Sequence, residues 1–192
     1  MPVSKSDLVG EKRWLRVHKR AFEHQGCIVD IGCEGWEWSR QFLGRKPVFG
    51  YGPLDAQPVP QGAVIFRYAV GPCDGEMILF GDGEEASCDR VSKQREARCI
   101  SRMDSMERIV EKHSPISVLK LNIERMEYAV LAMVRHPIAD QLAVSFHHCG
   151  PENRWRGPWT EAFVRALSRW YEPYKIMGQW GWWLFLAKDY HG

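Results

Sequence analysis

The residues best suited to chemistry lie where short apolar runs end in polar side chains. Asp30 and Gly32 close the first run, Asn122 and Glu124 follow a run at 116–121, and His147 follows one at 142–146. A histidine can remove a proton from a hydroxyl near neutral pH, so His147 is the candidate general base. Asn122 and Glu124 occupy alternating positions, so both are candidate catalytic residues facing the same crevice.

Other interpretations of these residues stay open. Glu124 is equally well placed as an acid at the N-terminus of the following helix, where the helix dipole favours it. His148 is a weaker candidate base than His147. A metal site built from Glu124, His147 and His148 stays open as an alternative, but these residues lack diagnostic metal-ligand spacing, and no metal is expected. The six cysteines contain no CxxC pair, which favours free thiols in a reducing compartment.

The glycine-containing stretch at 26–39 is typical of a buried strand, a tight turn and a helix start. Gly32 and Gly35 are three residues apart, so the dinucleotide pattern GxGxxG is missing, and so is the phosphate-binding pattern GxxxxGK[ST]. An S-adenosylmethionine site remains. That cofactor has no pyrophosphate, and its positive charge tolerates an acid such as Asp30 or Glu34 nearby.

Elements that would position these residues alternate along the chain. We expect helices at 6–24, 36–43 and 124–135, one beginning at the capping-box sequence 104–107, and one capped by Thr160. Strands are expected at 27–31, 47–51, 63–70, 77–80, 116–121 and 142–146, followed by a hairpin of 174–177 with 182–187. Residues 81–101 are expected to form an exposed loop. Alternation predicts a mostly parallel sheet with helices on both faces and a C-terminal antiparallel hairpin.

Bulk composition excludes several classes of protein. The 192 residues are 45% apolar, enough for one domain, here an N-terminal helix within 1–25 and a core at 26–192. The net charge of +2 argues against a nucleic-acid partner. No window is apolar enough to span a membrane, and residues 1–12 do not resemble a signal peptide. We therefore expect a cytoplasmic protein with a small-molecule substrate, whose oligomeric state the sequence does not fix.

Several segments, in order, resemble motifs of the FkbM-like family of S-adenosylmethionine-dependent methyltransferases. The strongest is 118–127 (VLKLNIERME), which is similar to a signature of the form LLKIDVEGAE. The other matching segments are 28–32 (IVDIG), 48–53 (VFGYGP), 69–76 (AVGPCDGE), 103–106 (MDSM) and 145–147 (SFH). The resemblance covers about residues 26–148, and the order of the motifs is its specific part.

The resemblance implies an α/β fold of the Rossmann-like class I methyltransferase type, with a mostly parallel seven-stranded sheet. It implies S-adenosylmethionine as cofactor and O-methylation of a hydroxyl on a small molecule or sugar. The residues it implies for cofactor binding are Asp30, Gly32, Cys33, Glu34, Gly35, Trp36, Tyr51, Gly52, Ala69 and Val70.

Departures from the family pattern support an alternative function. Gly52 stands where the family carries a ribose-binding acid, for which Asp55 is a possible substitute. Asn122 replaces an aspartate, Ser145 replaces a glutamate, and Arg125 replaces a glycine. The first loop is also one residue short. The alternative is a catalytically degenerate protein of the same fold that acts as a binding or interaction module.

Overall fold

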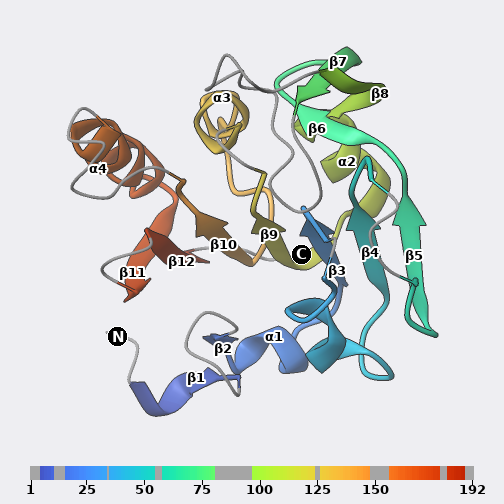
Figure 1. Ribbon diagram of the computed structural model, residues 1–192. Helices are drawn as coiled ribbons and strands as arrows, with labels where there is room; N and C mark the ends of the chain where they lie inside the picture. The colour runs from blue at the N-terminus through green and yellow to red at the C-terminus, as the bar shows by residue number, and fades with distance from the viewer. Residues whose placement is uncertain are drawn as a thin grey trace.

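The computed structural model describes residues 5–10, 16–33, 35–54, 58–80, 97–123, 126–147, 156–177 and 181–188 (Figure 1). Its main element is a seven-stranded sheet. In spatial order the strands are β11 (Tyr171–Met177), β12 (Trp182–Ala187), β10 (Gln141–Ser145), β9 (Ile116–Leu121), β3 (Cys27–Ile31), β4 (Val48–Tyr51) and β5 (Ala63–Phe66). Every residue of β3, β9 and β10 is buried, which explains why these strands are predominantly apolar in the sequence.

The direction of the strands confirms a mostly parallel sheet. β5, β4, β3, β9 and β10 are parallel to one another, whereas β12 is antiparallel to both β10 and β11. The predicted C-terminal hairpin is therefore confirmed, although its turn at 178–180 lies outside the described residues. The chain passes from β3 to β4 and β5 on one side, and β9 and β10 lie on the other side of β3. The strand order thus reverses between β3 and β9.

Alternate residues of the strands enter two core clusters, one on each face of the sheet. Val29 and Ile31 belong to the cluster that includes residues of α2 (Met106–His113), α3 (Glu127–Leu131) and α4 (Arg156–Leu167). Ile28 belongs to the second cluster, with residues of α1 (Arg20–Glu23) and the 3-10 helix Ser39–Phe42. Helices therefore lie on both faces, as predicted. None of the described helices is long and apolar enough to cross a membrane.

The predicted N-terminal helix at 6–24 is wrong over most of its described length. A 3-10 turn (Lys5–Asp7) leads into a short antiparallel pair, β1 (Leu8–Val9) with β2 (Val17–His18), and only α1 is α-helical. Tertiary hydrogen bonds explain the difference: the backbone of His18 exchanges two bonds with the side chain of Gln141. Arg20 also binds the Asp140 carboxylate at 2.9 Å. These long-range bonds outweigh the helical pattern.

The predicted helix at 36–43 is reduced to the 3-10 helix Ser39–Phe42. Trp36 has φ +53°, a left-handed conformation that no right-handed helix accommodates. The helix therefore starts after it. Trp38 and Phe42 are one turn apart, and their ring centroids lie 5.1 Å from each other.

The predicted strand at 63–70 is two strands in two different sheets. β5 ends at Phe66, and β6 (Ala69–Gly71) joins a three-stranded sheet with β8 (Ala97–Ser105) and β7 (Gly75–Phe80), in the order β6-β8-β7. Figure 1 shows this small sheet beyond the carboxyl ends of β4 and β5. Residues 97–101 are strand and not loop, and 81–96 of the expected loop lie outside the described residues.

Helix boundaries also differ from those expected. α2 is capped by Ser105, whose Oγ accepts a hydrogen bond from the backbone of Arg108 at 3.2 Å, and not by Asp104. α4 begins before Thr160, whose hydroxyl lies 2.8 Å from the Tyr128 hydroxyl and does not cap the helix. α3 is five residues long, and its predicted start at 124–125 lies outside the described residues.

Candidate functional site

The carboxyl ends of β3 and β9 meet where the strand order reverses. The backbone of Asn122 donates to the Ile31 carbonyl at 3.0 Å, and the backbone of Gly32 donates to the Tyr51 carbonyl at 2.8 Å. Gly32 has φ +81°, and a Cβ at this position would lie 1.8 Å from the Asn122 carbonyl oxygen. Only glycine fits this turn, and the turn brings Asp30, Gly32 and Asn122 together as predicted.

A buried ion pair lies directly beneath this turn. Lys120 Nζ is 2.7 Å from Asp30 Oδ1 and also donates to the Gly32 carbonyl at 2.7 Å. Asp30 is completely buried and Lys120 is 5% exposed. Asp30 Oδ2 is buried without a hydrogen-bond partner. An unpaired carboxylate oxygen buried at the end of a central strand is usually satisfied by an ordered water, through which it would contact a ligand bound at the turn.

His147 lies one strand further along the same edge and has an acidic partner. Its Nδ1 is 2.6 Å from Glu127 Oε1, and the Glu127 side chain is fully buried. The same carboxylate oxygen accepts a hydrogen bond from the backbone of Ile123 at 3.0 Å. Because a carboxylate accepts, Nδ1 of His147 donates, and the lone pair is on Nε2. The geometry is that of an oriented histidine base.

Glu127 is a functional candidate that was not predicted from the sequence. It belongs to the motif at 118–127, but no role was assigned to it. The signal was available: an acid in the first turn of a helix that directly follows the carboxyl end of a central strand. Its pairing with His147, 20 residues away, depends on β9 and β10 being adjacent and was not evident without the strand order.

The Tyr51 side chain is hydrogen-bonded to a second histidine and does not face an open crevice. Its hydroxyl is 2.8 Å from His113 Nε2, and its ring stacks on Phe66 at 4.8 Å. Burial raises the pKa of the Tyr51 hydroxyl, and burial also lowers the pKa of His113 to about 4. The next residue, Gly52, is buried and its backbone donates to the Phe66 carbonyl at 3.1 Å. This end of β4 thus presents no carboxylate at Gly52.

The depressed pKa of His113 predicts a pH-dependent loss of stability. His113 is neutral in the folded protein down to about pH 4, whereas in the unfolded chain it binds a proton below about pH 6.5. Its contribution is therefore fully present above pH 6.5 and is lost as the pH falls toward 4. We expect the free energy of unfolding to fall by about 2 to 3 kcal/mol over this range from this group.

Urea denaturation of the wild type and of His113→Gln at several pH values measures this contribution. Glutamine retains a hydrogen-bonding side chain but does not titrate, so its profile should lack the His113 component. Parallel profiles for the two proteins would contradict the prediction.

The remaining predicted residues of the first loop differ in their surroundings. Cys33 and Trp36 are buried in the core cluster that contains Ile28, and a Cβ at Gly50 would lie 2.5 Å from the Trp36 ring. Their side chains therefore contribute to the packing of the core. Gly35 has open space around its Cβ position, with no atom within 4 Å. Glu34 lies outside the described residues.

Ala69 and Val70 belong to β6 of the small sheet and not to the main sheet. Both are buried, and the backbone of Ala69 donates to Ser101 Oγ at 3.2 Å. β6 packs against α3, the helix that carries Glu127. The small sheet follows β5 along the chain, and the predicted role of Ala69 and Val70 at a cofactor stays a prediction.

Three residues considered from the sequence, Glu124, His148 and Asp55, lie outside the described residues. Within the described ranges, no group of three or more histidine, cysteine or acidic residues is placed to hold a metal ion.

Cys27, Cys33 and Cys73 are free thiols. Burial raises the pKa of the Cys27 thiol to about 11, which makes it unreactive.

Comparison with known proteins finds no matching family model, no matching curated protein and no matching solved structure. The resemblance to a methyltransferase family thus continues to depend on the sequence motifs. The chemistry of this edge of the sheet is inferred from its own geometry.

Proposed function

We propose that the protein is an S-adenosylmethionine-dependent methyltransferase of the FkbM-like type that methylates a hydroxyl of a small molecule or sugar. The observation that carries this proposal is the His147–Glu127 pair, which lies at the same edge of the sheet as the Gly32 turn. Ligands of open parallel sheets bind at the carboxyl edge where the strand order reverses. A base and a glycine turn at that place suit transfer to a hydroxyl.

The seven-stranded sheet supports the same proposal. One antiparallel strand, β12, lies between β10 and β11 in an otherwise parallel sheet. A mostly parallel sheet ending in an antiparallel hairpin is the arrangement implied by the sequence resemblance.

The residues at the turn fit a cofactor with a cationic amino acid portion. Asp30 Oδ2 is buried without a hydrogen-bond partner, so an intervening water would satisfy it and connect it to the ammonium group of a ligand at the turn. The space around Gly35 permits close approach of a ligand to the loop backbone. Asp30, Gly32 and Gly35 are thus the residues that would hold it. When bound, S-adenosylmethionine supplies an electrophilic methyl group.

The chain's own part in the reaction is to orient the acceptor and take its proton. Glu127 holds Nδ1 of His147, which places the lone pair on Nε2, the atom that would take the proton of the acceptor hydroxyl. The buried carboxylate of Glu127 also stabilises the imidazolium that forms. Lys120 fixes Asp30 and the Gly32 carbonyl, so the turn is rigid before any ligand arrives. Orientation of the two reactants then supplies much of the rate.

Transfer of a radiolabelled methyl group to a panel of small hydroxylated compounds, including monosaccharides and phenols, tests this function. We expect His147→Gln to lower turnover by about 10² to 10⁴-fold, the usual contribution of a general base. Glu127→Gln should lower turnover less and move the pH profile to lower pH, because the imidazolium loses its carboxylate partner. His136→Gln, an exposed histidine outside the site, is the matched control.

Full turnover by His147→Gln would show that His147 is not the base. Absence of methyl transfer to every acceptor would favour the alternative function. That alternative is a catalytically degenerate binding module. It is supported by one observation: the ribose-binding acid of the family is replaced by the buried Gly52, whose backbone is tied to Phe66. A module of this kind would retain the fold but show no methyl transfer.

A further inference from the structure

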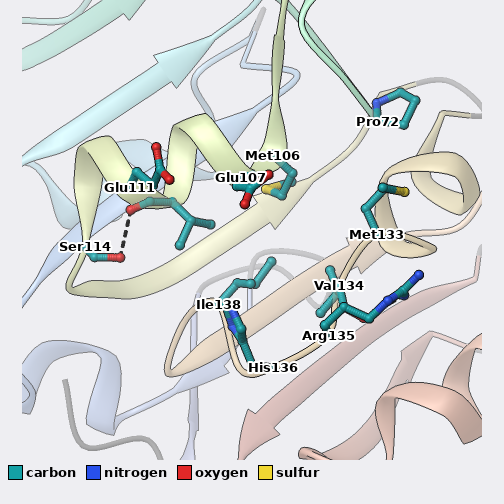
Figure 2. Close-up of a pocket in the computed structure, with 11 residues that line it drawn as sticks. Pro72, Met106, Glu107, Glu111, Ser114, Met133, Val134, Arg135, His136 and Ile138 are labelled. Carbon is teal, nitrogen blue, oxygen red and sulfur yellow. Dashed lines mark hydrogen bonds between the residues drawn. The ribbon is translucent and has the colours of Figure 1, made fainter.

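A cavity of about 550 Å³ lies between α2 and the segment that follows α3 (Figure 2). None of its lining residues belongs to the site at the ends of β3, β9 and β10. It arises because α3 ends at Leu131, so residues 133–138 face the length of α2 in place of a longer helix. Its volume falls within the range of sites for small organic ligands.

The floor of the cavity is apolar and adaptable. Met106, Val134 and Ile138 are almost completely buried there, and Met133 on the opposite wall is 54% exposed. Methionine side chains are flexible and polarizable, and they adjust to differently shaped apolar ligands. The floor therefore suits an alkyl or aromatic body.

The α2 wall adds two carboxylates. Glu107, Val110, Glu111 and Ser114 all line the cavity, and their three- and four-residue spacing places them on one face of α2. Both glutamates are exposed, and neither forms an ion pair with a described residue. Like charges one turn apart destabilise a helix, and Glu111 is also close to the helix C-terminus, where the dipole disfavours an acid. A bound cation would relieve both effects.

Arg135 and His136 lie on the opposite rim of the cavity. They do not neutralise the two glutamates of the α2 wall. The Arg135 guanidinium donates to the carbonyls of Ala132 and Val134 in its own segment. Figure 2 shows its side chain directed away from α2. The charges nearest to an occupant of the apolar floor on the α2 side are thus the two glutamates.

From these features we propose that this cavity binds a small cationic amphiphile, with its apolar body on the methionine-lined floor and its protonated amine between Glu107 and Glu111. The site is separate from the proposed methyl-transfer site and does not depend on that function.

Titration with 4-phenylbutylamine, 4-phenylbutanol and 4-phenylbutanoate tests the charge requirement with one apolar body. Methionine methyl groups labelled with carbon-13 report the position by NMR, because Met106 and Met133 line the cavity and Met77 on β7 does not. We expect shifts of Met106 and Met133, with the amine binding about five- to tenfold more tightly than the alcohol. The carboxylate should bind most weakly.

The Glu107→Gln/Glu111→Gln variant should bind the amine and the alcohol within about twofold of each other, since only the ion pairs are removed. Both positions are exposed, so the fold is kept, and Glu161→Gln on α4 is the control with unchanged selectivity. Equal binding of the amine and the alcohol by the wild type would overturn the proposal. So would shifts confined to Met77, an amine preference unchanged in the double variant, or no saturable binding of the amine.

Discussion

Replacing Gly32 with alanine should lower the free energy of unfolding by about 2 to 4 kcal/mol and abolish ligand binding at the first turn. The residue has φ +81°, which costs a side-chain-bearing residue about 1 kcal/mol or more. The added Cβ would also lie 1.8 Å from the Asn122 carbonyl oxygen. Because that contact is with backbone, β3 and β9 must separate at the reversal of strand order, at a cost of about 1 to 3 kcal/mol. Urea denaturation measures the change.

Gly35→Ala is the matched control three residues further along. Its Cβ would meet no atom within 4 Å, and its φ lies outside the left-handed range. We expect its stability to stay within about 0.5 kcal/mol of the wild type. Comparable losses in the two variants would show that the turn is not held as closely as the structure indicates.

Replacing Lys120 with methionine should lower the free energy of unfolding by about 3 to 5 kcal/mol. Lys120 and Asp30 form a buried ion pair at 2.7 Å, and Lys120 also binds the Gly32 carbonyl. Removal of one partner leaves the other charge buried without compensation, which is the costly case for an ion pair in a core. Thermal and urea denaturation measure the loss.

The double variant Asp30→Asn/Lys120→Met distinguishes a buried charge from lost packing. With both charges removed, no uncompensated ion remains, so the double variant should be more stable than Lys120→Met alone. If the losses of the two single variants simply add in the double variant, the pair is not coupled and its role in holding the turn is refuted.

The central strands could be predicted from the sequence because burial on both faces leaves predominantly apolar runs. The runs at 27–31 and 116–121 match β3 and β9, and the terminal hairpin was also evident. The N-terminal segment could not be predicted, because its conformation is set by bonds to Asp140 and Gln141, more than 100 residues away. The break of the strand at 63–70 was equally hidden, since no turn residue marks the change of sheet at Arg67 and Tyr68.

The edge that brings Asp30, Gly32, Asn122 and His147 together could be predicted, because parallel strands end at one edge. The hydrogen-bond and ion-pair partners of these residues could not be predicted from the sequence. The contact between Glu127 and His147 requires that β9 and β10 be known as neighbours, and the position of Lys120 in a strand does not by itself indicate its bonds to Asp30 and Gly32. Cys33 and Trp36 were predicted at the cofactor, and the structure places their side chains in the core. The residue types and spacing of Cys33 and Trp36 are compatible with a cofactor site and with a core. Only the packing seen in the structure distinguishes these two environments.

The most direct test of the proposed function is calorimetric titration of the intact protein with S-adenosylmethionine and S-adenosylhomocysteine. The structure predicts saturable binding with a dissociation constant below about 1 mM, since Asp30 and the Gly32 turn are already positioned before a ligand arrives. Gly35→Ala narrows the open space at the loop and should weaken binding while the fold remains intact. Absence of binding of either compound at millimolar concentration would contradict the assignment of this edge as a methyltransferase site.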